Sequence, residues 1–204
     1  MRVIFCGYRD WALNVINNIK SHPRIKGYKI ISSKKKYDDE FNELVENTDI
    51  IIFLGWSWII PKEVTQNHLC LGVHPSDLPN YRGGSPIQNQ IIDGVTKTKV
   101  SLMTLDEKLD AGSVWLKKDL DLNGDNIESV FKNIENSTIA LFEIFFNTYP
   151  NINPTEQNLE LGSYFKRRNA EQSRLEIDDF KYKSLKDIYN FVRCLTDPYP
   201  NAYL

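Results

Sequence analysis

The sequence predicts an α/β protein built on a doubly wound, mostly parallel sheet, with a short C-terminal appendage. Two observations carry this prediction. Short apolar runs that suit buried strands recur along the first half of the chain, and segments with the spacing of amphipathic helices separate them. Strands that alternate with helices in this way form parallel sheets with right-handed crossovers.

The strands expected in the first half are short apolar runs: Arg2–Cys6, Tyr28–Ile31, Ile50–Leu54 and Leu69–Val73. Between the first two, Trp11–Ile19 carries apolar residues on one helical face, and Asp10 is the expected N-cap. Phe41–Val45 belongs to a polar, acidic helix, and Pro61 is expected to start a short helix. Each strand is therefore followed by a helix or a turn.

The loops at the carboxyl ends of these strands are the expected ligand site, because open α/β sheets bind ligands there. The first strand is followed by residues 7–10, the third by residues 55–60 and the fourth by residues 74–86. We expect these loops to share one rim of the sheet.

After His74 the pattern changes to a loop rich in Pro and Gly that ends at Pro86. The elements expected beyond it are a helix (Ile87–Ile92), two strands (Val100–Leu105 and Val114–Leu116), a long helix (Ile127–Phe146) and a last helix (Leu185–Leu195). The polar stretch Asn151–Leu161 is interpreted as a linker. The expected organisation is a main domain over residues 1–150 and a linker with a small C-terminal element over residues 151–204.

Charge and hydropathy exclude several classes of protein. The 25 Lys and Arg residues against 27 Asp and Glu residues give a net charge of −2, whereas bulk binding to nucleic acid needs a basic excess. No apolar run approaches the roughly 20 residues that cross a bilayer, and the N-terminus lacks a signal peptide. A soluble, cytoplasmic protein that binds neither nucleic acid nor membrane is expected.

The cysteines and histidines form no metal-site pattern. Cys6, Cys70 and Cys194 are far apart and lack a CxxC pair, so buried core thiols are expected. The residues after Gly7 do not contain the G-x-G-x-x-G fingerprint, which makes a nicotinamide dehydrogenase a poor match. No metal is expected.

His74 is the first candidate for chemistry. It ends a buried strand at the predicted ligand rim, and a rigid Pro/Gly loop follows it. The acidic loop after the next strand can bring Asp106, Glu107 or Asp110 beside it. A histidine paired with a carboxylate in a cleft is suited to general acid–base catalysis.

The stretch H-P-S-D-L-P-N-Y-R-G-G-S-P-I-Q, followed by D-E-K-L-D-A-G, resembles the folate-dependent formyltransferase family. The resemblance implies a Rossmann-like catalytic domain. It also implies acyl transfer from N10-formyltetrahydrofolate to a primary amine, with tetrahydrofolate as the product and no metal. His74 and Asp110 match two members of the family's catalytic trio. His74 would take the amine proton and contact the developing oxyanion, and Asp110 would orient His74 or a bound water.

Gly72 occupies the position of the third member, an asparagine whose amide stabilises the oxyanion. Losing one such donor costs about 3 kcal/mol. Three interpretations remain open: another donor, for example Asn80 or Gln88, has been recruited; the enzyme is slow; or it no longer catalyses. A loop rebuilt around a positive φ at Gly72 would also explain the change.

The resemblance also assigns ligand-binding residues. The folate pterin is expected between the loops at residues 55–60 and 106–110, in contact with Trp56, Ser57, Trp58, Ile59, Asp106 and Leu109. The acceptor is expected to contact Arg9, Ser76, Tyr81, Arg82, Gly83 and Arg168, with Arg193 as a further candidate cation. A diphosphate needs such cationic partners.

The C-terminal segment is closest in pattern to sugar-nucleotide N-formyltransferases and to the region after the catalytic domain of methionyl-tRNA formyltransferase. The family's Arg-Arg-x-Pro-Glu reads Arg167-Arg168-Asn169-Ala170-Glu171 here. The expected acceptor is a dTDP- or UDP-linked amino deoxy sugar, of the kind used in lipopolysaccharide O-antigen biosynthesis, and a homodimer is a further expectation. Two alternatives are a non-catalytic folate- or nucleotide-binding relative and a tRNA-type formyltransferase without its C-terminal domain.

Overall fold

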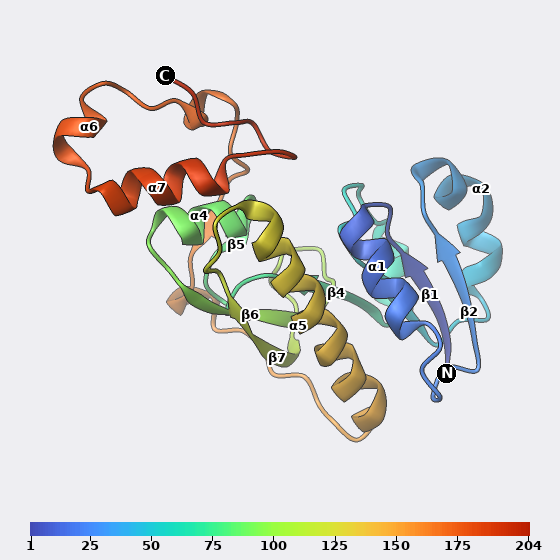
Figure 1. Cartoon of the computed structure of the whole chain (residues 1–204). Helices are drawn as coiled ribbons and strands as arrows, with labels where there is room; N and C mark the ends of the chain where they lie inside the picture. The colour runs from blue at the N-terminus through green and yellow to red at the C-terminus, as the bar shows by residue number, and fades with distance from the viewer.

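A computed structural model describes all 204 residues and contains a six-stranded sheet in the order β2-β1-β3-β4-β6-β7 (Figure 1). The first four strands in the chain are parallel, whereas β6 and β7 join as antiparallel strands. Their bounds are β1 (Arg2–Cys6), β2 (Gly27–Ile31), β3 (Ile50–Phe53), β4 (Cys70–His74), β6 (Lys97–Thr104) and β7 (Val114–Asp121). The predicted doubly wound, mostly parallel sheet is confirmed.

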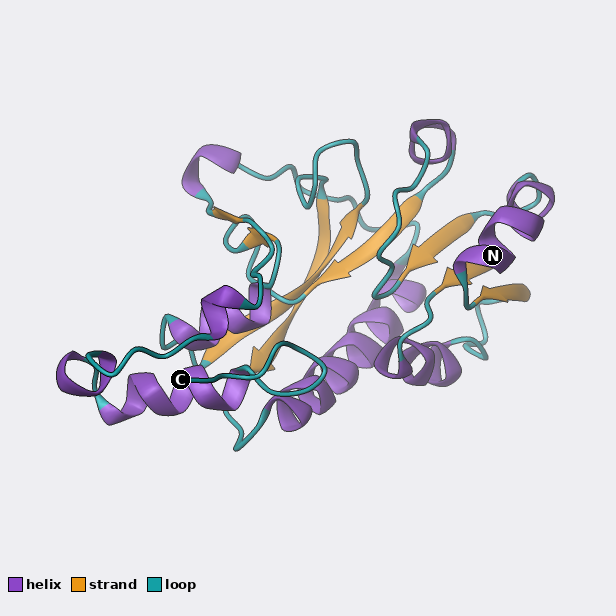
Figure 2. Cartoon of the chain, turned by 90° about the horizontal axis from the view of Figure 1, so that it is seen from above, coloured by secondary structure: helices purple, strands orange, loops and turns teal.

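Helices cover both faces of this sheet, and Figure 2 shows the longest of them, α5, running along one face. The helices are α1 (Asp10–Ile19), α2 (Lys34–Val45), α3 (Lys62–Asn67), α4 (Pro86–Ile92), α5 (Ile127–Thr148), α6 (Asp179–Tyr182) and α7 (Leu185–Cys194). The larger core cluster packs α1 and α5 against the sheet, with Phe142, Phe145 and Phe146 fully buried. A smaller cluster around Tyr37 and Phe41 places α2 on the other face.

Two local predictions about element ends were wrong. Helix α1 begins at Asp10 itself, and the N-cap is Arg9, whose backbone is extended and whose side chain makes no capping bond. Strand β7 extends from Val114 to Asp121 instead of ending at Leu116. The three consecutive exposed residues Lys117–Asp119 break its apolar pattern, whereas its backbone goes on pairing with β6 as far as Asp121.

The chain after α5 returns to the main sheet. Thr155 forms a bridge with Val114 on β7, and β8 (Tyr164–Phe165) pairs in parallel with β5 (Arg82–Gly83) as a second, two-stranded sheet. Figure 1 shows α7 against α4 at one end of the molecule, with α6 beside it. Residues 151–168 therefore lie along the Pro/Gly loop and the edge of β7, although the domain boundary at residue 150 stays a prediction.

All three cysteines are buried free thiols, as expected. None of the helices combines the length and the apolar character that crossing a membrane requires. No cluster of three or more His, Cys, Asp or Glu side chains is arranged to hold a metal ion.

Candidate active site

His74 lies at the carboxyl end of β4, where it is only 5% exposed. Its Nε2 lies 2.7 Å from the carbonyl oxygen of Tyr81. Because a carbonyl only accepts hydrogen bonds, Nε2 carries the hydrogen, and the neutral ring has its free lone pair on Nδ1. Nδ1 faces the carboxylate of Asp110, with 3.5 Å between Nδ1 and Oδ2. The ring is therefore oriented to gain a second proton beside a carboxylate.

Asp110 is the acidic-loop residue that reaches His74. Its backbone is left-handed, with φ at +53°, a conformation that Asp tolerates better than most residues. The backbone N–H of Gly83 donates to Oδ2 over 2.8 Å and orients the carboxylate. Of the other two candidates, Asp106 accepts a bond from the N–H of Glu107, and Glu107 pairs with Lys62. Of the three acidic residues that the sequence left open as partners of His74, Asp110 is the one that lies beside it.

The Pro/Gly loop that carries Tyr81 is held by the segment after α5. Tyr81 has a φ of +55°, its ring stacks on Phe165 with 5.3 Å between centroids, and its N–H donates to Ser163 Oγ over 2.8 Å. Burial, with a hydrogen bond to Asp93, raises the pKa of Tyr81 to about 12, so its phenol stays neutral. At Gly83, a Cβ would lie 2.2 Å from the carbonyl oxygen of Phe165, so only glycine fits.

Gly72 faces an apolar side chain instead of an empty space. A Cβ at this position would lie 2.7 Å from Cδ2 of Leu105. The φ of Gly72 is not left-handed, so the expectation of a positive φ is wrong. The space into which a side chain at position 72 would project is occupied by Leu105.

The recruited-donor candidates do not reach the reacting pair. Asn80 is exposed, and Gln88 is 2% exposed on α4; neither hydrogen-bonds His74 or Asp110. The Gln88 amide makes no hydrogen bond of normal geometry, although it lies close enough to the Tyr199 hydroxyl to influence its pKa. No side-chain amide therefore forms a hydrogen bond with the His74 ring.

The loop at residues 55–60 and the acidic loop supply walls for a flat aromatic ligand. Trp58 packs on Tyr8 and on Trp56, with ring centroids 4.6 and 4.7 Å apart. Ile59 is 93% exposed and Leu109 is 60% exposed, two apolar side chains that no part of the chain covers. The indole N–H of Trp56 is buried without a hydrogen-bond partner.

Further contacts connect these two loops to their surroundings. Ser57 Oγ lies 2.8 Å from the hydroxyl of Tyr8 and accepts a longer bond from Arg9. The ion pair between Lys62 and Glu107 links α3 to the acidic loop. The ion pair and the exposed Ile59 and Leu109 thus associate two loops that each carry an apolar side chain open to solvent.

Four of the predicted acceptor contacts are engaged inside the protein. Ser76 is fully buried and donates to the carbonyl of Asn80 over 2.6 Å. Arg82 donates to the carbonyls of Pro79 and Leu159, and buried Arg193 to those of Leu122 and Gly124. Arg168 lies over the ring of Phe191 and bonds the carbonyl of Gln172. These four side chains bind backbone carbonyls of the protein itself; Arg82, for example, holds the Pro/Gly loop at Pro79.

Arg9 and Arg167 have no carboxylate partner. Arg9 lies over the ring of Tyr8, and the exposed Arg167 makes no side-chain hydrogen bond. Both influence Tyr199: burial raises the pKa of its phenol, while Gln88 and the two guanidinium groups oppose that rise. The sequence analysis named Arg9 and Arg168 as candidate cations for the acceptor and did not name Arg167, which belongs to the same Arg-Arg motif.

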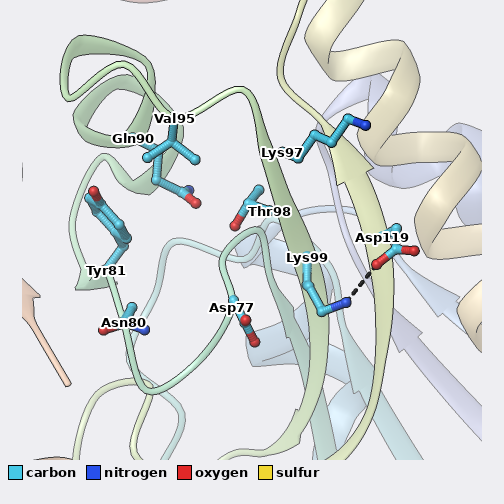
Figure 3. Close-up of a pocket in the computed structure, with 9 residues that line it drawn as sticks. All are labelled: Asp77, Asn80, Tyr81, Gln90, Val95, Lys97, Thr98, Lys99 and Asp119. Atoms are coloured by element: carbon cyan, nitrogen blue, oxygen red, sulfur yellow. Dashed lines mark hydrogen bonds and ion pairs between the residues drawn. The ribbon is translucent and has the colours of Figure 1, made fainter. Parts of the chain in front are cut away.

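A hollow of about 310 Å³ lies behind Tyr81, lined by Asp77, Asn80, Tyr81, Gln90, Val95, Lys97, Thr98, Lys99 and Asp119 (Figure 3). Among its charged side chains, Lys99 pairs with Asp119, and Asp77 pairs with Lys117 outside the lining. Neither His74 nor Asp110 lines it, so this hollow is separate from the reacting pair.

Comparisons with known proteins agree with this geometry. Residues 13–140 match the family model described as formyl transferase. A methionyl-tRNA formyltransferase from Rickettsia massiliae is 30% identical over 235 residues, which cover 100% of this chain and 76% of the relative.

Solved structures of similar fold include two formyltransferases with different acceptors. The methionyl-tRNA formyltransferase from Clostridium thermocellum has 34% identity and a TM-score of 0.85, covering 99% of this chain and 86% of the other. A sugar N-formyltransferase from a Shewanella species has 18% identity and a TM-score of 0.80, covering 100% and 92%, which shows a shared fold. The family match and the full-length identity show that the chain belongs to the formyl transferase family, enzymes that use N10-formyltetrahydrofolate as formyl donor.

Proposed function

We propose that this enzyme transfers a formyl group to the amino group of a dTDP- or UDP-linked amino deoxy sugar. The observation that carries the reaction chemistry is the orientation of His74. Its Nε2–H is held by the Tyr81 carbonyl, so Nδ1 is the basic atom, 3.5 Å from the Asp110 carboxylate. That arrangement provides a base whose protonated form is stabilised where it is produced.

The reaction steps assign the proton to named atoms. N10-Formyltetrahydrofolate supplies the electrophilic formyl carbon. His74 Nδ1 takes the proton that the attacking amine loses, and the resulting imidazolium stabilises the negative charge on the formyl oxygen. His74 then returns this proton to the departing nitrogen, so a formamide and tetrahydrofolate are the products. Asp110 stabilises the imidazolium and stays ionised.

The folate would be held by the two loops beside this pair. Trp56, Trp58 and Ile59 would form one wall, with Ser57 at the rim, and Leu109 and Asp106 the other. Leu105, which packs with Trp56 and Ile60, would form the base. Apolar walls exclude water from the formyl group, which protects it from hydrolysis.

The acceptor's diphosphate would lie between Arg9 and Arg167. Both guanidinium groups lack carboxylate partners, and both act on the Tyr199 phenol; two such cations would suit a diphosphate. The backbone of Arg167 lies against Gly84, where a Cβ would be only 2.3 Å from Arg167 Cα. The residue before Gly84, Gly83, donates its N–H to the Asp110 carboxylate, so Arg167 lies close to the reacting pair along the chain of contacts. A structure of similar fold from a Shewanella species is a sugar N-formyltransferase, so this fold is compatible with a sugar acceptor. On this proposal residues 1–150 carry the reacting groups and residues 151–204 complete the acceptor site.

A second candidate acceptor is the aminoacyl group of methionyl-tRNA. The methionyl-tRNA formyltransferases from Rickettsia massiliae and Clostridium thermocellum, at 30% and 34% identity, favour it. The net charge of −2 favours the sugar nucleotide, because a tRNA-binding surface needs a basic excess.

The deciding experiment offers the enzyme N10-formyltetrahydrofolate with either a panel of dTDP- and UDP-linked amino sugars or methionyl-tRNA. Release of tetrahydrofolate is followed by its absorbance, and the product by mass spectrometry. We expect turnover of at least one nucleotide sugar. The KM for that sugar should be about tenfold higher in Arg167→Ala than in the wild type. Lys166→Ala, at the adjacent exposed position, is the matched control. Turnover of methionyl-tRNA alone would contradict the proposal, and no turnover of any acceptor would favour a non-catalytic relative.

A further inference from the structure

Gln157 contacts the acidic loop from a distant part of the chain. Its Nε2 donates one hydrogen to the carbonyl of Asp110, over 3.0 Å, and the other to the carbonyl of Gly112, over 2.7 Å. Both carbonyls lie where the chain leaves the turn that ends at Asp110, one on Asp110 itself and the other two residues further on. One amide group therefore holds two points of the same short turn.

The position of Gln157 is fixed by the strand edge beside it. Thr155 makes two backbone hydrogen bonds with Val114, each of 2.8 Å, at the start of β7. This bridge aligns residues 155–157 with the end of the acidic loop. Gln157 is therefore held on the sheet and does not depend on a flexible segment.

The turn needs such support because Asp110 has an unfavourable backbone. Its φ of +53° is a left-handed conformation, which an L-residue keeps only where its surroundings enforce it. From one side, the Gly83 N–H holds the carboxylate; from the other, Gln157 holds the main-chain carbonyl of the same residue. The carboxylate then lies 3.5 Å from His74 Nδ1.

We infer that Gln157 is a positioning residue for the formyl transfer: it keeps Asp110 in the left-handed conformation that directs its carboxylate at His74. This inference rests on the assignment of His74 and Asp110 as the reacting pair, but not on the identity of the acceptor. Gln157 acts only through Asp110. Its loss therefore lowers kcat and leaves the binding of folate largely intact.

The test is the Gln157→Leu variant, which keeps the size of the side chain and removes both hydrogen bonds. Its first readout is the side-chain ¹H–¹⁵N spectrum of the histidines, which needs no acceptor. We expect the His74 signals to move toward those of Asp110→Asn, while those of His22 and His68 stay unchanged. With an acceptor found in the screen described above, we expect kcat to fall at least tenfold and the KM for N10-formyltetrahydrofolate to change less than twofold.

Two further variants keep the inference falsifiable. Gln66→Leu is the matched control, because Gln66 contacts the same loop at Glu107 Oε1, over 3.4 Å, and should leave the His74 signals unchanged. Gln157→Asn retains a polar amide that is too short to reach both carbonyls, and it replaces Gln157→Leu if the latter does not fold. Wild-type His74 signals in the folded Gln157 variant would overturn the inference. The spectral test needs no acceptor, so it can be carried out even if the acceptor screen fails. Failure of the proposed function and failure of the inference about Gln157 are therefore distinguishable.

Discussion

Leu105 occupies the space beside Gly72: a Cβ at position 72 would lie 2.7 Å from Leu105 Cδ2 and 3.3 Å from its Cγ. The two residues belong to neighbouring segments, since Leu105 directly follows β6 and its N–H donates to the carbonyl of Cys70 over 2.8 Å. The missing side chain at position 72 and the leucine opposite it are thus complementary in size. An apolar contact thus lies where the family resemblance leads us to expect an asparagine.

We predict that Gly72→Asn destabilises the protein by about 1–3 kcal/mol and lowers activity, because the new side chain is forced against Leu105. In Gly72→Asn with Leu105→Ala, the asparagine gains room. We expect the double variant to be more stable than the sum of the single changes by about 1 kcal/mol or more. Urea unfolding of the four proteins measures this coupling, and strictly additive effects would contradict the steric account.

His74→Asn should lower kcat at least a hundredfold with little change in KM. The reason is that proton uptake and the charge on the imidazolium both act in the transition state, whereas the proposed folate contacts lie on the two adjacent loops. Steady-state kinetics with the identified acceptor measures both constants. A kcat close to that of the wild type would refute the role of Nδ1.

Asp110→Asn should be nearly as damaging as the histidine change, while Asp106→Asn should be mild. Asparagine tolerates a left-handed φ as well as aspartate does, so the first change removes the charge and keeps the turn. Asp106 only accepts a bond from the Glu107 N–H, which an amide oxygen also accepts. Equal losses of kcat in the two variants would contradict this division of roles.

Stability should fall at alkaline pH through the buried thiols. Burial raises the pKa of Cys70 to about 12, and an unfolded thiol ionises near 8.5. Between these values the folded chain keeps the proton and the unfolded chain loses it. The unfolded state then binds fewer protons, and the free energy of unfolding falls as pH rises.

Between pH 8 and pH 10, the free energy of unfolding of Cys70→Ala should therefore fall by about 2 kcal/mol less than that of the wild type. Urea unfolding at the two pH values measures the difference. Ile51→Val, a core change on the neighbouring strand that removes no titrating group, is the control and should lose as much as the wild type. If the free energy of unfolding of Cys70→Ala fell as much as that of the wild type, the Cys70 thiol would not contribute to the loss of stability at alkaline pH.

The sheet could be predicted from the sequence because its central strands are buried on both faces. Ile50–Phe53 has no residue exposed to solvent, so its apolar run predicts a strand without knowledge of its neighbours. The pairing of His74 with Asp110 was also predictable, from a family motif. Gln157 was not, because its role depends on the Thr155–Val114 bridge, a tertiary contact that leaves no local pattern in a polar segment.

The segment that returns along β7 after α5 also affects when activity can arise during synthesis. Because a chain leaves the ribosome from its N-terminus, the sheet strands up to Asp121 emerge before residues 155–168. A nascent chain at that stage already contains His74 and Asp110. It still lacks Gln157, Arg167 and β8, the partner of β5, so the groups that we propose to position Asp110 and to bind the acceptor are synthesised after both members of the reacting pair.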